Sequence, residues 1–335
     1  MKILYLTRKS STYSIEKVFS LVENRLKDYA YINTKKAYSK YDKPFHVLIN
    51  LIHFIFIYFK NRNKYDIFHI TGVIHYVSIL FPPSKTVLTI HDCIKYHQQK
   101  GLKKIIVKYL WFKLPVNHLK YITVISEKTK KELVEITQCS SQKIRVIYNP
   151  LDESYLYNDN NFNSFCPRIL HVGTTPNKNL NNLFHSLKRT NCLLIIVGNI
   201  THDEKKTLEQ LKINYRCLSN ISEEEMVEQY NLCDIVSFIT TYEGFGLPII
   251  EAQSVGRVVI SSRMNPHMEV GGDGAFYVDP HNIDEIENGF KNLISNPNLR
   301  KYLIEEGKKN IQNFLVDKIS NKYLEFYESI IHANN

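Results

Sequence analysis

Short apolar runs recur along the chain, and a polar residue or a segment with helical periodicity follows each one. In the first half these runs occupy residues 3–7, 65–70, 86–90, 121–125 and 144–148. Their shortness and their content of β-branched residues predict strands that are buried on both faces, as in a parallel sheet. Residues 14–26 and 127–137 have helical spacing, and Ser126 is a suitable N-cap for the second of these helices.

The second half of the chain repeats this alternation. Predicted strands occupy residues 168–172, 193–197, 234–239 and 257–261, and predicted helices occupy residues 181–188, 202–211 and 222–232. Two successive series of this kind predict an α/β fold with two parallel sheets. The length of 335 residues also exceeds what one core usually holds. Residues 152–165 are polar and rich in Asn, so we expect domains at 1–151 and 152–315.

Residues 45–59 are the most apolar stretch of the chain, and a basic cluster at residues 60–64 follows them. This stretch is too short for a membrane span, and His46, Asn50 and His53 interrupt it. A buried helix is one interpretation of the pattern. A helix that lies in a membrane interface, with the basic cluster on lipid phosphates, is the other.

Charge is divided unevenly between the two halves. Residues 1–150 contain 26 Lys and Arg against 9 Asp and Glu, a balance of +17, whereas residues 151–335 contain 17 against 24, a balance of −7. The basic half favours an anionic partner such as a lipid headgroup, a polyphosphate or a nucleic acid. A solvated basic surface is the simpler alternative.

The cysteines and the N-terminus indicate a reducing compartment. None of the six cysteines belongs to a CxxC pair or has zinc-type spacing to a His, which is typical of free thiols. Five residues separate Lys2 from Arg8, too few for the apolar core of a secretory signal. We therefore expect a cytoplasmic protein.

The strongest chemical signal is the segment 243–251 (EGFGLPIIE), which follows the predicted strand 234–239 and opens a helix. Its glycines allow the backbone to approach a ligand closely, and Pro248 suits the start of a helix. The N–H groups of the first helical turn, together with the helix dipole, favour a phosphate group. A carboxylate such as Glu251 can accept hydrogen bonds from both hydroxyls of a ribose. The pattern therefore predicts a site for a nucleoside diphosphate.

With this motif the sequence resembles the retaining family 4 glycosyltransferases, whose donor-site signature is similar to EGFGLPIIEAQSVG. YDIFHITG, TIHD, TVISEKTKKEL and IRVIYNPLD resemble landmarks of the family's first domain, and LHVGTTPNKNL and SSRMNPHMEVGGDGAFYVDP resemble landmarks of its second. The resemblance covers nearly the whole chain. It implies the GT-B fold, an α/β architecture in which two Rossmann-like domains face each other across a deep cleft. The first domain would bind the acceptor, the second would bind the nucleotide-sugar donor, and a last helix at about 316–335 would pack back on the first.

The resemblance also implies roles for residues of the donor domain. Glu251 would bind the ribose, and Glu243 would be a catalytic residue that contacts the transferred sugar near the reaction centre. Lys178 would neutralise the departing diphosphate. Phosphate and sugar oxygens would be held by the backbone amides of Phe245, Gly246 and Leu247.

The loop that carries Lys178 departs from the family pattern. It begins with Gly173 and Thr174, which would also line the donor. Thr174 stands where the family often has an Arg that pairs with the diphosphate. Phosphate binding would therefore depend more strongly on Lys178.

In the first domain the resemblance implies that His91, in TIHD, is a catalytic residue that faces the cleft and contacts the sugar or the acceptor. It follows a predicted strand, and open α/β sheets bind ligands at the carboxyl ends of their strands. Asp92 would orient this His or cap the next turn, and His69 is a further candidate for the acceptor side. The loop 8–14 lacks the glycine pair that the family commonly has after its first strand.

For the reaction, the resemblance implies retention of the anomeric configuration without a divalent metal, and no DxD pair occurs near the donor motif. The resemblance of the segment GTTPNKN to mannosyltransferase-like members of the family favours GDP-mannose over a UDP-sugar as the nucleotide-sugar donor. The basic first half and residues 45–59 favour an oligosaccharide acceptor on a polyprenyl pyrophosphate, as in the assembly of an O-antigen or a capsule. The enzyme would then be peripheral on the anionic inner face of the plasma membrane.

Three alternatives compete with this interpretation. A nucleotide-sugar epimerase can share the fold. A catalytically inactive protein that keeps the fold and binds polyanions or RNA is favoured by Thr174, although no RNA-binding motif with stacking aromatics occurs, so we expect no nucleic-acid partner. An NAD-dependent Rossmann enzyme is disfavoured because no GxGxxG follows the first predicted strand.

Overall fold

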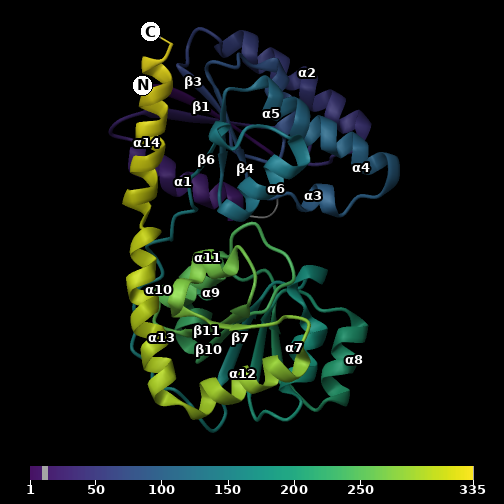
Figure 1. The fold of residues 1–335 in the computed structure, drawn as a ribbon, viewed down its shortest axis with the longest axis vertical. Coiled ribbons are helices and arrows are strands. Elements are labelled where there is room, and N and C mark those ends of the chain that lie inside the picture. The colour runs from purple at the N-terminus through teal and green to yellow at the C-terminus, as the bar shows by residue number, and fades with distance from the viewer. Residues whose placement is uncertain (10–13, 335) are drawn as a thin grey trace. The chain divides into compact units, whose positions relative to one another are not determined.

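The computed structural model describes residues 1–9 and 14–334 of the chain. The chain divides into two compact units, each with its own parallel sheet (Figure 1). Unit 1 consists of Met1–Pro150 and Val316–Asn335, and unit 2 consists of Leu151–Leu315. Unit 1 therefore contains both ends of the chain, because the last helix joins the first sheet.

The six strands of unit 1 pair in the order β2-β1-β3-β4-β5-β6, and every pair is parallel. They are β1 (Lys2–Thr7), β2 (Tyr31–Lys36), β3 (Ile67–Ile70), β4 (Thr86–Ile90), β5 (Tyr121–Val124) and β6 (Ile144–Val146). All side chains of β3 and β4 are buried, as their continuous apolar runs predict.

Helices cover both faces of this sheet. They are α1 (Ser14–Leu26), α2 (Pro44–Asn61), η1 (His75–Leu80), α3 (Ile94–His97), α4 (Gly101–Val107), η2 (Lys108–Lys113), α5 (Leu114–His118), α6 (Glu127–Thr137), η3 (Ser141–Lys143) and α14 (Val316–His332). The connection through α1 runs outward from β1 to β2, whereas the later connections run in the opposite direction along the sheet. Right-handed crossovers therefore place α1 on one face and α2 to α6 on the other. α14 packs beside α1 (Figure 1).

A buried polar cluster fixes α14 to the sheet of unit 1. The ring of His69 on β3 hydrogen-bonds through Nδ1 to the Tyr327 hydroxyl at 2.7 Å and through Nε2 to the Thr89 hydroxyl at 2.7 Å. The Thr89 hydroxyl lies 2.6 Å from that of Thr123, and the Tyr327 hydroxyl lies 3.2 Å from that of Tyr5. Both ring nitrogens of His69 are thus used inside the core, so the structure does not support His69 as a candidate for the acceptor side.

The six strands of unit 2 pair in the order β12-β11-β10-β7-β8-β9, again all parallel. They are β7 (Arg168–Val172), β8 (Leu193–Val197), β9 (Asn214–Leu218), β10 (Ile235–Phe238), β11 (Val258–Ser262) and β12 (Phe276–Val278). The helices are η4 (Pro176–Lys178), α7 (Leu180–Leu187), α8 (His202–Gln210), α9 (Glu223–Leu232), α10 (Leu247–Ser254), α11 (His267–Gly271), η5 (Gly272–Gly274), α12 (Ile283–Ser295), α13 (Pro297–Asn310) and η6 (Ile311–Asn313). The sheet grows outward from β7 to β9, and the chain then returns to add β10 to β12 on the other side of β7. The strand order therefore reverses between β7 and β10.

The sequence pattern does not predict three strands, β2, β9 and β12, and each of them is an edge strand. An edge strand keeps part of its surface in solvent, so it does not need a continuous apolar run. The sequences of β2 (YINTKK) and β9 (NYRCL) are accordingly mixed, and most of their side chains are at least partly exposed.

The apolar segment 45–59 lies within α2, and it is not a buried helix. The buried residues of α2 are Asn50, Phe54, Ile57 and Asn61, whereas most of its other large apolar side chains are exposed. The interpretation of this segment as a buried helix is therefore wrong. Within residues 1–9 and 14–334, no helix is both long and apolar enough to cross a membrane.

Buried histidines make the stability of unit 1 depend on pH. Burial lowers the pKa of His69 and of His75 to about 3, from an ordinary value of 6.5. The unfolded chain binds a proton at these positions below pH 6.5, whereas the folded chain does so only near pH 3. The contribution of these two histidines to the free energy of unfolding is therefore fully present above pH 6.5 and is lost as the pH falls toward 3.

We predict that the free energy of unfolding decreases between pH 7 and pH 5, by roughly 2 kcal/mol from His69 alone. Urea unfolding followed by circular dichroism at the two pH values measures this decrease. It should be smaller in His69→Gln, whereas His281→Asn, at an exposed histidine, should leave it unchanged. The same pH dependence in wild type and His69→Gln would contradict the prediction.

Candidate active site

The loops that follow β7 and β10 meet because these two strands are direct neighbours in the sheet. Residues 173–178 leave the end of β7, and residues 239–246 leave the end of β10. The Thr241 amide donates to the Asn177 carbonyl at 2.8 Å and so joins the two loops through their backbones. Open α/β sheets bind ligands at such a reversal of strand order, beyond the carboxyl ends of the strands. Most of the predicted donor-site residues lie on these two loops.

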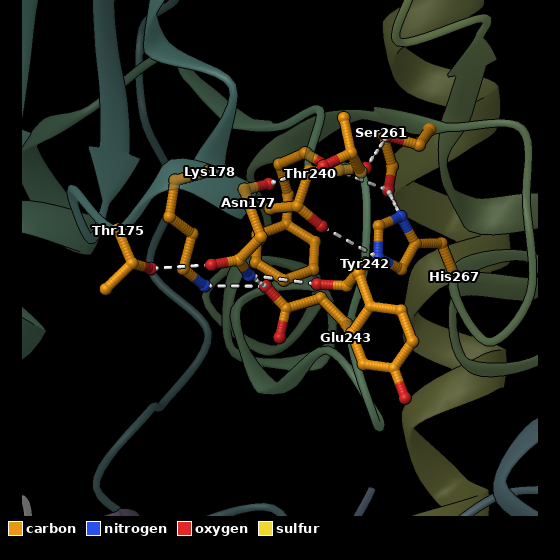
Figure 2. A network of polar contacts seen from close by, with 11 residues as sticks. Thr175, Asn177, Lys178, Thr240, Tyr242, Glu243, Ser261 and His267 are labelled. Carbon is orange, nitrogen blue, oxygen red and sulfur yellow. Dashed lines mark hydrogen bonds and ion pairs between the residues drawn. The ribbon is translucent and has the colours of Figure 1, made fainter. Parts of the chain in front are cut away.

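Lys178 and Glu243 form an ion pair across the two loops (Figure 2). Lys178 Nζ lies 2.7 Å from Glu243 Oε1, and the two side chains are only 17% and 19% exposed. Asn177 Nδ2 donates to the same carboxylate oxygen at 3.2 Å and to the Tyr242 carbonyl at 2.9 Å. The Thr175 hydroxyl donates to Asn177 Oδ1 at 2.7 Å and thereby orients the amide. The cation and the carboxylate are therefore held in one defined geometry.

Two glycines with positive φ leave room for this arrangement. Gly173 has a φ of +94°, and a Cβ atom there would lie 2.8 Å from Lys178 Cε. Gly198, directly after β8, has a φ of +139°, and a Cβ atom there would lie 2.7 Å from Thr174 Cγ2. Thr174 therefore packs closely on Gly198. In residues 173–180 the one cationic side chain is Lys178, so the loop's positive charge resides there.

The GFGLP segment forms the start of α10. Gly246 is the N-cap with a φ of +119°, a conformation that favours glycine, and Pro248 is the second residue of the helix. The Phe245 side chain is buried, with its ring edge-to-face on Phe314 at a centroid distance of 5.8 Å. Phe245 can therefore offer a ligand its backbone and not its ring. The amides of Gly246 and Leu247 lie at the positive end of the helix dipole, a geometry that suits a phosphate group.

A tyrosine from α9 holds the carboxylate of Glu251, which lies in the second turn of α10. The Tyr230 hydroxyl donates to Glu251 Oε2 at 2.6 Å. Burial, and then the charge of Glu251, raise the pKa of Tyr230 well above its ordinary value, so the hydroxyl keeps its proton and remains a donor. The Tyr230 ring packs edge-to-face on Tyr155, with centroids 5.2 Å apart. Tyr230 therefore orients Glu251.

A second polar cluster supports the loop after β10 (Figure 2). The Thr240 hydroxyl lies 3.1 Å from His267 Nε2, and the Ser261 hydroxyl lies 3.2 Å from His267 Nδ1. The Ser262 hydroxyl donates to the Thr240 carbonyl at 2.6 Å. All four side chains are buried. These bonds anchor the start of the loop that carries Glu243.

His91 lies in unit 1, directly after β4 as predicted, and it is buried. Its Nε2 donates to the Thr71 carbonyl at 2.8 Å. Burial lowers the pKa of His91 to about 4, so the ring is neutral at pH 7 and Nδ1 is its acceptor nitrogen. Asp92 Oδ1 accepts from the Ile94 amide at 2.9 Å, which is the capping role expected as one of its two alternatives.

The strand order of unit 1 reverses between β1 and β3. Of the glycine-free loop 8–14 that follows β1, residues 10–13 lie outside the described residues. The close backbone approach at this reversal involves Gly72, after β3. A Cβ atom on Gly72 would lie 2.8 Å from the Arg8 amide nitrogen. The glycine that permits this approach therefore lies in the loop after β3 and not in the loop after β1.

Two family models match the chain, one in each half. Residues 18–155 match the model described as Glycosyltransferase Family 4, and residues 158–310 match the model described as Glycosyl transferases group 1. Together they cover most of the sequence. The chain belongs to the family 4 glycosyltransferases.

Relatives and solved structures agree with this family. This glycosyltransferase is 26% identical to the O-antigen chain mannosyltransferase RfbU of Salmonella typhimurium over 249 residues, 69% of each chain. It is 25% identical to the capsular polysaccharide biosynthesis glycosyltransferase CapM of Staphylococcus aureus over 244 residues, 64% of this chain and 62% of CapM. The structure of Anabaena HepE in complex with UDP and glucose has a TM-score of 0.79 at 16% identity, over 98% of this chain and 100% of that chain. The likeness confirms the GT-B fold that the sequence resemblance implies.

Three residues of the candidate site are not predicted from the sequence. Asn177 stands beside Lys178 in PNKN, but the motif does not reveal that the amide reaches Glu243. His267 belongs to SSRMNPHMEVGGDGAFYVDP, one of the segments that resemble the family. Its contacts with the loop after β10 depend on the pairing of β11 with β10. Tyr230 lies on a helix outside the motifs. The fold alone brings these side chains to the site.

We predict that Tyr230→Phe weakens the binding of a nucleoside diphosphate by about tenfold, because Glu251 loses the hydrogen bond that orients it. The buried ring remains, so the variant should stay folded. Isothermal titration calorimetry with GDP and with UDP measures the change. Tyr302→Phe, at an exposed tyrosine of unit 2, is the matched control and should bind like wild type. Unchanged affinity in Tyr230→Phe would show that Tyr230 does not position Glu251.

Proposed function

We propose that this glycosyltransferase moves a hexose from a nucleoside diphosphate sugar to a saccharide acceptor, with retention of the anomeric configuration and without a divalent metal. The observation that carries the proposal is the Lys178–Glu243 ion pair on the loops beside the N-terminus of α10. An oriented ammonium and helix amides suit a diphosphate, and an oriented carboxylate suits sugar hydroxyls.

In this proposal the donor binds at the reversal of strand order in unit 2. The diphosphate accepts hydrogen bonds from Lys178 and from the amides of residues 245–247, close to Gly173 and Thr174. Glu251 accepts hydrogen bonds from the ribose hydroxyls. Glu243 accepts hydrogen bonds from hydroxyls of the transferred sugar. The contacts of Glu251 with Tyr230, and of Glu243 with Lys178, support these roles because they hold each carboxylate in a defined orientation.

The bond that breaks joins the anomeric carbon to an oxygen of the diphosphate, and the bond that forms joins that carbon to the acceptor oxygen. The electron pair of the breaking bond stays on the diphosphate, whose negative charge rises in the transition state. Lys178 stabilises this charge more strongly than it stabilises the bound donor. The acceptor proton passes to the departing phosphate oxygen on the same face of the sugar, which retains the configuration.

His91 acts in this proposal as a neutral hydrogen-bonding residue. Its Nε2 proton is committed to the Thr71 carbonyl, so Nδ1 accepts from a hydroxyl of the sugar or of the acceptor. Burial lowers the pKa of His91 to about 4, which keeps this form throughout the neutral range. A protonated His91 is therefore not required for the reaction near pH 7.

The sugar and the acceptor are proposed from the relatives and from charge. RfbU is an O-antigen chain mannosyltransferase, and CapM is named for capsular polysaccharide biosynthesis. We extend these roles to this chain, with GDP-mannose as the first candidate donor and a UDP-sugar as the second. The basic unit 1 suits an acceptor on a polyprenyl pyrophosphate at the cytoplasmic face of the plasma membrane, where an O-antigen or a capsule is assembled.

We predict that GDP or UDP raises the melting temperature of the purified protein and that Glu251→Ala abolishes the shift, because the ribose loses its acceptor. Differential scanning fluorimetry with UDP, GDP, ADP, CMP and NAD measures the shift in melting temperature. Glu209→Ala, at an exposed glutamate of α8, should keep the shift. Stabilisation by NAD alone, or by no nucleotide, would contradict the proposed donor site.

We predict that Lys178→Met lowers kcat by about 100-fold to 1000-fold with a smaller effect on nucleotide affinity, because the charge it stabilises develops in the transition state. Turnover of the donor that the nucleotide screen selects, followed by NMR of the product's anomeric signal, measures rate and configuration. Lys205→Met on the exposed side of α8 is the control. An inverted product would contradict retention, and an epimerised nucleotide sugar without acceptor product would favour the epimerase.

A further inference from the structure

The helix α2 carries a stripe of exposed apolar side chains along its length. Its members recur at intervals of three or four residues, so they share one side of the helix. They are Phe45, Leu48, Ile52, Ile55, Phe56 and Phe59. The side that packs on the core is different and includes Asn50, Phe54 and Ile57. Exposed apolar surface of this extent is unusual on a soluble unit and marks an interaction site.

A second exposed apolar stripe occurs on the consecutive segments α4, η2 and α5. It consists of Leu102, Ile105, Ile106, Tyr109, Leu110 and Leu114. Between these residues, Val107, Trp111 and Phe112 turn inward and are buried. Each of the two stripes therefore lies opposite a side that anchors its helix in the core of unit 1.

Both stripes belong to the same side of the unit 1 sheet. The right-handed connections place α2 and α4 to α5 on one face, opposite α1 and α14. The short helix η1 joins them: Asn50 of α2 donates to the Tyr76 hydroxyl at 2.9 Å, and the Tyr76 ring packs on Trp111 of η2 at 5.0 Å. Figure 1 shows α2, α4 and α5 on the side of unit 1 away from α14. We call the twelve exposed side chains of the two stripes the α2–α4 face.

The segments that form the α2–α4 face carry cationic residues and no acidic ones. Residues 43–65 and 93–126 contain eleven Lys and Arg residues and no Asp or Glu. Some of these cations lie on exposed aromatic rings of the face: the Arg62 guanidinium is 5.5 Å from the Phe59 ring centroid, and Lys113 Nζ is 5.4 Å from that of Tyr109. The nearby carboxylate of Asp42 is paired with Lys95. Apolar side chains are thus interleaved with cations that no acidic residue of these segments balances.

We infer that the α2–α4 face binds the surface of an anionic phospholipid bilayer. The exposed Phe, Ile and Leu side chains enter the boundary between headgroups and acyl chains, and the Lys and Arg side chains contact lipid phosphates. A symmetric dimer through this face is disfavoured, because it would bring two sets of cations together. An apolar protein partner would leave the same cations without counter-charges.

The inference extends the proposed function, and in one respect it rests on it. If the acceptor is carried on a lipid, this face brings the acceptor-binding unit to the membrane that holds it. The evidence for the face comes from unit 1 alone, whereas the evidence for donor binding comes from unit 2. The two proposals can therefore fail separately.

Co-sedimentation of the full chain with phospholipid vesicles tests the inference. We expect binding to phosphatidylglycerol-containing vesicles, weak binding to pure phosphatidylcholine vesicles, and weaker binding at high salt. The double variant Phe56→Ser with Leu102→Ser removes one side chain from each stripe, 70% and 72% exposed. It should bind anionic vesicles at least about tenfold more weakly than wild type.

The chain offers a closely matched control in unit 2. Phe165 and Leu156 are 85% and 71% exposed, so the double variant Phe165→Ser with Leu156→Ser removes the same residue types from another surface. It should bind vesicles like wild type. The double variant Lys60→Glu with Lys103→Glu keeps the apolar stripes and should lose the preference for anionic vesicles.

Absence of vesicle binding by the wild type would overturn the inference, and so would equal binding by wild type and the Phe56→Ser, Leu102→Ser variant. Sedimentation of wild type without lipid as a dimer that this variant abolishes would instead assign the face to a second copy. Thermal stabilisation by GDP or UDP is measured on the same samples. Vesicle binding without nucleotide binding would count against the proposed function alone, and nucleotide binding without vesicle binding would count against the α2–α4 face alone.

Discussion

The reversal of strand order in unit 2 is the constraint on which the candidate site depends. Because β10 pairs with β7 and not with β9, which precedes it in the chain, two loops from distant parts of the sequence meet at one edge of the sheet. A backbone hydrogen bond from Thr241 to Asn177 and the ion pair of Lys178 with Glu243 then span these loops. A sheet assembled in simple sequential order would separate β7 from β10 by two strands, and neither contact could form.

The Lys178–Glu243 pair also balances a negative charge at the candidate site with a positive one. A carboxylate suited to sugar hydroxyls repels a diphosphate bound nearby, and a partly buried carboxylate without partners is costly. Lys178 and Asn177 both donate to Glu243 Oε1, which satisfies that oxygen. An ammonium group has three protons, so Lys178 can remain hydrogen-bonded to Glu243 and still donate to a phosphate. This arrangement also explains the glycine at position 173. Lys178 lies close to its backbone, and a side chain there would displace the lysine.

Sequence periodicity predicts the central strands and the helix α6, whose N-cap Ser126 accepts from the Thr129 amide as expected, because local chemistry determines them. It fails for the edge strand β2, whose polar residues face solvent. For α2 the pattern indicates a helix but not which sides meet the core, because apolar residues surround it. The donor motif is visible in sequence, whereas Tyr230, which orients Glu251, becomes visible only when α9 packs on the sheet.

The net charge differs in sign between the two units, and the two proposals assign a different kind of anion recognition to each unit. Unit 1 contains 28 Lys and Arg against 12 Asp and Glu, a balance of +16, whereas unit 2 contains 15 against 21, a balance of −6. An acidic unit cannot attract a diphosphate through its net field, so the proposed donor site relies on hydrogen-bond donors at contact distance, which are Lys178 and the amides at the start of α10. The cations of unit 1 are spread over its surface and act at longer range, where salt screens them. Under the two proposals, the strength of membrane attraction can therefore change without altering the chemistry of the proposed donor site.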